Sequence, residues 1–177
     1  MNFTRTSTIG IDTIINSIQT DLYNALISRW VDDIDGYGRV YKTDTGNGIV
    51  PRYYISENDY RDVYYTDNIS GNFFFLTSDE STTKDGFVYQ NDTKVVFTID
   101  LSRIIGSGRE DELVRRDAIE ILRELSYGVF EITGIDTGVE KVFRGLDTSK
   151  VEKSDINPLH TFSVNIRLNY YIEDKCN

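Results

Sequence analysis

Side chains that could act as a nucleophile with a partner base are scarce in this sequence. Among its 177 residues there is one histidine, His160, and one cysteine, Cys176. A serine or cysteine nucleophile needs a base held beside it, and no serine of the chain lies in a G-x-S-x-G context. Cys176 lies on a terminal tail without a preorganised site, and a single cysteine cannot form an intrachain disulfide. We therefore expect His160 to be a structural or surface residue and expect no nucleophilic catalysis.

The motifs for metal and phosphate binding are also missing. A structural zinc site needs clustered cysteine and histidine ligands, and this chain has one of each. One turn holds carboxylates that calcium could use, namely Asp32, Asp33 and Asp35 before Gly36. Their register departs from the D-x-D-x-D-G pattern, and no glutamate follows at the closing position. The glycines of segment 106–108 lack the later glycine of a nucleotide loop. We predict neither a cofactor nor a metal, and no enzyme.

Aromatic side chains are the unusual chemical feature of the chain. It has 12 Tyr, 9 Phe and 1 Trp, several of them in doublets or triplets. Adjacent residues of a strand point to opposite faces, so each run directs at least one ring away from a single core. A second protein chain or a sugar would cover such rings, and so would neighbouring loops and long side chains. From these runs we predict a subunit interface at Tyr53, Tyr54, Tyr64, Tyr65, Phe73 and Phe74.

Size and charge limit the class of protein. A chain of 177 residues with 39% hydrophobic residues can form one domain with a packed core, which we place over residues 1–177. Its net charge of −10 repels nucleic acid and anionic membranes. No apolar run reaches the roughly 18 residues needed to span a bilayer, and the first residues lack the apolar centre of a secretory signal. We expect folding in a reducing cytoplasm, no membrane association and no sequence-specific DNA binding.

Two segments have the periodicity of amphipathic helices. Apolar residues recur at helical spacing over residues 11–30 and again over residues 110–126. Polar turn residues from Asp32 to Gly38 should end the first helix. A capping box from Ser107 to Glu110 should start the second, and Gly128 should stop it in a left-handed conformation.

The remaining segments have β-type patterns. The region 37–101 contains six candidate strands: RVYKT, IVPRYYIS, DVYYT, NFFFLTS, GFVYQ and TKVVFTIDL. Segment 44–48 predicts a hairpin turn between the first two, and Pro51 makes the second an edge strand or starts it after the proline. In the last region, about 129–172, VFEITGIDTG and EKVFRGL predict two strands, and the alternation from Thr161 to Ile172 predicts a long final strand. These elements predict an α+β fold, with a mostly antiparallel sheet and both helices packed on one face.

The order of these elements resembles that of bacteriophage tail-terminator and head-tail neck proteins. The features that match are an N-terminal amphipathic helix, a strand-rich middle with an extended hairpin, TKVVFTIDL leading into a second helix, and the closing run PLHTFSVNIRLNYYI. The middle region with its clustered tyrosines is longer than that fold requires. The resemblance implies a small subunit that forms a homo-oligomeric ring at the end of a tail tube or below a portal, without enzymatic activity.

The resulting hypothesis is a virion protein of a phage neck or tail, assembled in the host cytoplasm. Its partners would be copies of itself and the adjoining portal, neck or tail-tube proteins. DNA would pass through the ring without specific binding, because an acidic channel does not attract phosphate. The alternative is a carbohydrate- or peptide-binding module that uses exposed tyrosines. An enzyme would require a carboxylate pair in a concave pocket.

Overall fold

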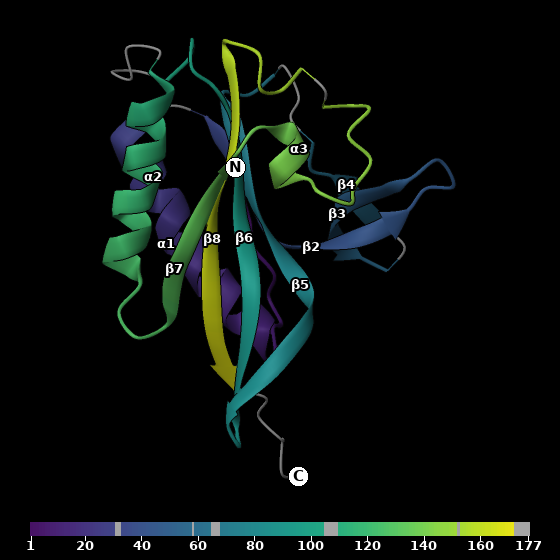
Figure 1. The fold of residues 1–177 in the computed structure, drawn as a ribbon, viewed down its shortest axis with the longest axis vertical. Coiled ribbons are helices and arrows are strands. Elements are labelled where there is room, and N and C mark those ends of the chain that lie inside the picture. Colours follow the sequence, from purple (N-terminus) through teal and green to yellow (C-terminus); the bar gives the residue numbers. More distant parts are fainter. Residues whose placement is uncertain (31–32, 58, 65–67, 105–109, 152, 172–177) are drawn as a thin grey trace.

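The computed structural model describes the chain except for residues 31–32, 58, 65–67, 105–109, 152 and 172–177. Its elements follow in the order β1 (Asn2–Phe3), α1 (Ile11–Trp30), β2 (Ile34–Asp44), β3 (Ile49–Ser56), β4 (Asp59–Asp62), β5 (Gly71–Asp85), β6 (Val88–Asp100), α2 (Asp111–Leu125), β7 (Phe130–Thr137), α3 (Val139–Val142) and β8 (Leu159–Tyr171). Figure 1 shows α1 and α2 packed against the sheet and α3 set apart from them.

One sheet organises the molecule, with strand order β4-β3-β2-β5-β6-β8-β7 and β1 paired to β2. The β1–β2 and β2–β5 pairs are parallel and the other pairs are antiparallel. The α+β class and the mostly antiparallel sheet are therefore confirmed, as is the long C-terminal strand, which β8 forms over 13 residues. Along the sheet, β7 is the outermost strand at one end and β4 at the other.

The face of the sheet that contacts α1 and α2, here called the helix face, carries the larger core. From α1, Ile15, Leu22 and Leu26 are buried at the spacing that places them on one side of a helix. They belong to the same cluster as Phe73 and Phe97 of the central strands. Both predicted amphipathic helices thus pack on one face, as expected.

The opposite face of the sheet, here called the outer face, is also covered in part. Phe74 and Val96 point to this side and belong to a second buried cluster with Val142 and Phe143. The segment EKVFRGL is therefore not a strand as predicted, because Val139, Val142 and Phe143 follow helical spacing and their one turn of helix caps the sheet. Gly138, with φ of 89°, precedes this turn in a conformation that favours glycine.

The two long helices match their predicted ranges. Helix α2 starts at Asp111 after Glu110, which makes no side-chain capping hydrogen bond. The other residues of the predicted capping box fall at 107–109, outside the described residues. Gly128 adopts φ of 74°, which confirms the left-handed conformation expected after the helix.

Several strand boundaries differ from the predictions. The polar segment Ile34–Gly38, predicted as a turn, is the start of β2, because β1 and β5 pair with it on its two sides. The predicted strands GFVYQ and TKVVFTIDL are joined in the single strand β6, from Val88 to Asp100, and β8 pairs with it over this whole length; Gly86 and Phe87 lie in the turn before it. In DVYYT, β4 ends at Asp62, Val63 and Tyr64 are not in a strand, and residues 65 and 66 lie outside the described residues.

The predicted hairpin at 44–48 is confirmed, since Asp44 pairs with Ile49 across it. The prediction for Pro51 was wrong, because β3 starts before it and lies between β2 and β4. The proline is tolerated there because the β4 ladder begins only at Arg52.

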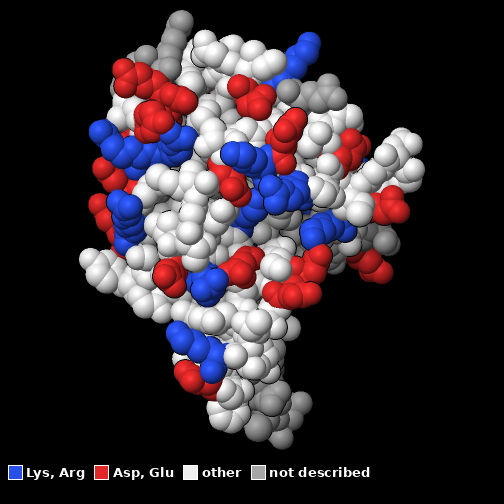
Figure 2. Space-filling model, in the orientation of Figure 1, with Lys and Arg blue, Asp and Glu red and all other residues white. Residues whose placement is uncertain are grey.

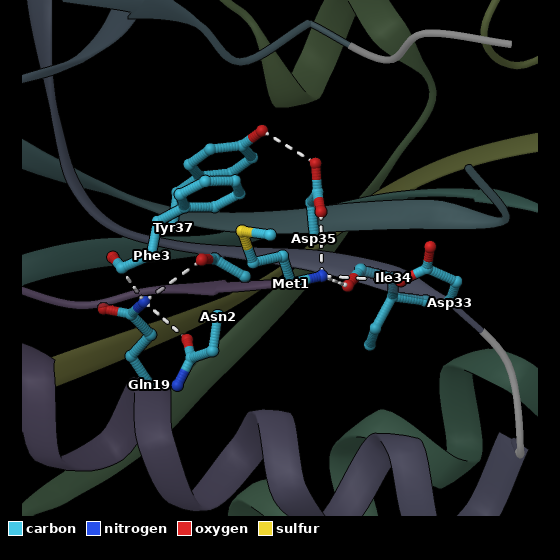
Figure 3. A network of polar contacts seen from close by, with 9 residues as sticks. Met1, Asn2, Phe3, Gln19, Asp33, Ile34, Asp35 and Tyr37 are labelled. Carbon is cyan, nitrogen blue, oxygen red and sulfur yellow. Dashed lines mark hydrogen bonds and ion pairs between the residues drawn. The ribbon is translucent and has the colours of Figure 1, made fainter. Parts of the chain in front are cut away.

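A polar network joins the first residues to α1 and β2 (Figure 3). The Gln19 side chain is buried and its amide nitrogen donates to Asn2 Oδ1 at 2.7 Å, to the Phe3 carbonyl at 2.9 Å and to the Gly36 carbonyl at 3.1 Å. The Phe3 ring stacks on Tyr37 with centroids 4.8 Å apart. This one amide therefore ties β1, α1 and β2 together.

Candidate interaction surface

Four of the six predicted interface residues are buried inside the chain. The exposed fractions are 3% for Tyr53, 5% for Tyr64, 0% for Phe73 and 1% for Phe74. The prediction that these four rings need cover from another chain is wrong, because both faces of the sheet are packed: Phe73 lies in the core of the helix face, and Tyr53, Tyr64 and Phe74 lie in the core of the outer face. Of the other two, Tyr54 is half-buried, and Tyr65 lies outside the described residues.

The buried tyrosines use their hydroxyls within the fold. The Tyr53 hydroxyl donates to the Phe3 carbonyl at 2.7 Å, and the Tyr64 hydroxyl donates to the Asp147 carbonyl. Burial raises the pKa of both phenols above their ordinary value, so both remain neutral donors. Tyr64 therefore anchors the segment after α3 and is not free to stack on a sugar, as the alternative function requires.

The single histidine is a core residue. His160 is 6% exposed and its ring stacks on Phe162 with centroids 5.2 Å apart. Burial lowers the pKa of His160, while the charges of Asp111, Arg115 and Asp155 shift it in opposing directions. A structural histidine was one of the two expected outcomes, and this is the one observed. Cys176 lies outside the described residues.

Two of the candidate calcium ligands, Asp33 and Asp35, have other partners, and Asp32 lies outside the described residues. Asp35 accepts from the Met1 ammonium at 2.9 Å and from the Tyr37 hydroxyl at 3.0 Å, as Figure 3 shows. Across the part of the chain that the structure describes, no three histidine, cysteine or acidic side chains gather as a metal site would require. This segment is therefore the start of strand β2, where Asp35 is held by hydrogen bonds within the chain.

The β5–β6 hairpin is the most exposed part of the sheet. Strand β2 accompanies β5 only to Phe75, so the outer edge of β5 from Leu76 to Asp85 is unpaired among the described residues. Every residue from Ser78 to Phe87 is exposed, and Phe87 beside the turn is 84% exposed. In Figure 1 this hairpin extends past the lower ends of the helices. It is a projecting arm with an apolar side chain at its tip.

A groove of about 550 Å³ runs between α2 and β7, and we call it the α2–β7 groove. It is lined by Glu112, Arg115, Arg116, Ile119, Glu120, Arg123, Ile135 and Thr137. Arg116, Ile119 and Arg123 lie at helical spacing on one side of α2. Opposite them, Ile135 of the outermost strand β7 is 45% exposed. The groove thus combines apolar and cationic side chains beside an open strand edge.

A second hollow, about 490 Å³, lies on the outer face below α3, where Figure 2 shows a group of basic side chains. Its cations are Lys42, Lys94, Lys141, Arg144 and Arg167. Carboxylates neutralise three of them, by Asp79 at 2.6 Å from Lys42, Asp136 at 2.8 Å from Lys94 and Asp92 at 2.9 Å from Arg167. Despite opposing desolvation, hydrogen bonds from Lys94 and Asn165 lower the pKa of Asp136, so this carboxylate stays charged.

Comparison with known families and with curated proteins gives no relative for this chain: no family model and no curated protein matches it. Within the described residues, none of the helices has the length and hydropathy to cross a membrane. The sequence analysis missed both the arm and the α2–β7 groove. The helical spacing of Arg116, Ile119 and Arg123 could have indicated the groove from the sequence. Nothing in the sequence indicated that Phe87 would be exposed at the tip of an arm.

Proposed function

We propose that this chain is a non-enzymatic structural subunit of a homo-oligomeric ring in a bacteriophage neck or tail, where the ring surrounds the DNA channel. The resemblance in element order supports the assignment to this class of virion protein. The observed features consistent with it are the α+β fold, the N-terminal helix α1, the extended β5–β6 hairpin, and strand β6 followed by α2.

The observation that carries the proposal is the set of open strand edges in the described sheet, at β4, at β7 and along part of β5. Strand β7 pairs on one side only, and the outer edge of β5 is unpaired beyond Phe75. Uncovered edges are templates for pairing with another chain, and monomeric proteins usually protect them. Pairing of β7 of one copy with the free part of β5 of the next joins two different edges and is therefore a head-to-tail contact. Head-to-tail contacts close into rings when the rotation between copies allows it.

The test is the mass and shape of the purified protein. We expect native mass spectrometry to give one multiple of the subunit mass, and negative-stain images to show rings with a central hole. A monomer that persists at concentrations of about 100 µM would contradict the proposal, since a ring subunit of this kind must associate through its own edges.

A further inference from the structure

The tip of the β5–β6 hairpin combines an apolar ring with negative charge. Phe87 is 84% exposed, which is unusual for a phenylalanine, and it follows the turn residue Gly86 with φ of 64°. Asp85 precedes the turn, with Lys84 next to it, and Glu80 lies further back along β5; all three are exposed. No ion pair joins Asp85 or Glu80 to a described residue. Among the described residues the hairpin therefore presents a ring, two carboxylates without an ion pair and one ammonium group, a net negative charge, to solvent.

The α2–β7 groove has the complementary composition. Ile119 and Ile135 supply apolar surface, and Arg116 and Arg123 are exposed at its rim. Arg116 reaches Glu120 only at 3.6 Å, and Arg123 has no ion pair with any described residue. In a chain of net charge −10, a groove with exposed arginines selects an acidic partner.

The tip and the groove lie in different parts of one molecule (Figure 1). We infer that the β5–β6 hairpin of one subunit docks in the α2–β7 groove of the next, with Phe87 between Ile119 and Ile135 and with Asp85 facing Arg116 and Arg123. The occupant of the groove is a second copy of this chain. Docking also brings the open edge of β5 beside the open edge of β7, so that the sheet can continue between subunits. This inference rests on the proposed ring and names the surfaces that form it.

Two double variants separate the two sides of this contact. The hairpin variant carries Asp85→Ser and Phe87→Ser, and the groove variant carries Arg116→Glu and Arg123→Glu. All four side chains are exposed, so both variants should fold, which circular dichroism melting against the wild type checks. Arg144→Glu, an exposed charge reversal on the outer face, is the matched control.

We expect each double variant alone to be monomeric at concentrations where the wild type and Arg144→Glu form rings. An equimolar mixture of the two should give a heterodimer and nothing larger. The groove variant supplies the intact hairpin and the hairpin variant supplies the intact groove, so each pair of subunits can form one contact only. Mass photometry and native mass spectrometry measure both outcomes. If one double variant unfolds, Asp85→Ser alone and Arg123→Glu alone replace it, each with an expected loss of assembly of at least tenfold in concentration.

The possible failures are distinguishable. Rings formed by either folded double variant as readily as by the wild type would overturn the hairpin-in-groove contact and leave the ring proposal standing. A mixture that stays monomeric, when each variant alone has lost assembly, would also overturn the pairing of these two surfaces. A wild type that is monomeric throughout would remove the proposed function, and this inference with it.

Discussion

Gln19 shows how much of this fold depends on one buried amide. Its nitrogen serves three acceptors on β1 and β2, at 2.7 to 3.1 Å, in a site that solvent does not reach. Gln19→Leu keeps the volume but removes the donor to Asn2 Oδ1 and to the Gly36 carbonyl, while the Phe3 carbonyl keeps the Tyr53 hydroxyl. We expect this loss to lower the free energy of unfolding by about 2–3 kcal/mol. Urea denaturation measures this.

The matched control is Gln90→Leu. The Gln90 amide is half-buried and donates to Asn169 Oδ1 alone, at 2.9 Å. Its replacement should cost less than about 1.5 kcal/mol. Equal losses for the two variants would show that the network around Gln19 adds nothing to a single hydrogen bond.

His160 gives the stability of the protein a specific pH dependence. Because burial lowers its pKa in the folded chain below the ordinary 6.5, protonation favours the unfolded state. Its contribution is complete above pH 6.5 and is lost as the pH falls through the folded pKa. Since this is the only histidine, we expect wild-type stability to fall below pH 6.5 with an added slope of up to about 1.4 kcal/mol per pH unit.

The comparison variant for this pH dependence is His160→Gln, which has a polar side chain that does not titrate. Denaturant titrations at several pH values from 7.5 to 5.5 should show a flatter profile for the variant. The same slope in both proteins would assign the proton uptake to other groups.

Among the glycines in strands, Gly71 at the start of β5 has the least space for a side chain. A Cβ at Gly71 would lie 2.9 Å from the Thr98 carbonyl oxygen and 2.6 Å from Ile99 Cδ1, so β5 and β6 would have to separate. We expect Gly71→Ala to destabilise the protein by about 1–3 kcal/mol. Gly134→Ala on β7 is the control, because its Cβ would meet only Asn165 Nδ2 at 3.7 Å, and it should be nearly neutral in thermal melts. A neutral Gly71→Ala would show that the two strands can shift apart at no cost.

The long elements were predictable because each repeats one period over many residues. The buried side of α1 and the alternation of β8 are both properties of their own segments. The second core was not predictable in this way. Phe74 is covered by Phe143, which lies far along the chain, directly after the single helical turn α3, and the pattern of that turn is too short to distinguish from a strand. The aromatic runs therefore suggested exposed rings in need of a partner chain, although the second core of the same chain buries most of them.

The candidate site escaped prediction for a related reason. A register shift between Ile132 and Gly134 changes which side of β7 each residue faces. Ile132 packs against the helix-face core, and Ile135, three residues later, lines the α2–β7 groove. Strict alternation would have placed these two on opposite sides of the sheet, so the strand pattern alone could not join Ile135 to the arginines of α2.

For the molecule as a whole, the net charge determines whether it binds DNA. With a net charge of −10, the wild type should not retard duplex DNA in gel shifts at about 150 mM salt, as a channel that lets DNA slide requires. Retention of DNA under those conditions would contradict a passive channel.

The basic hollow on the outer face allows a test of whether DNA binding depends on the net charge or on the cations of this one site. Asp79 and Asp92 are exposed and neutralise Lys42 and Arg167, so Asp79→Asn with Asp92→Asn should free two cations beside Lys141 and Arg144. We expect this variant to retain DNA weakly at about 50 mM salt and to release it as salt rises, since each phosphate contact is lost with counterion release. Asp21→Asn with Glu124→Gln changes the net charge equally at exposed sites on the two long helices, away from the hollow, and should not retain DNA. Retention by both variants would make net charge the cause, and retention by the first alone would assign it to the hollow.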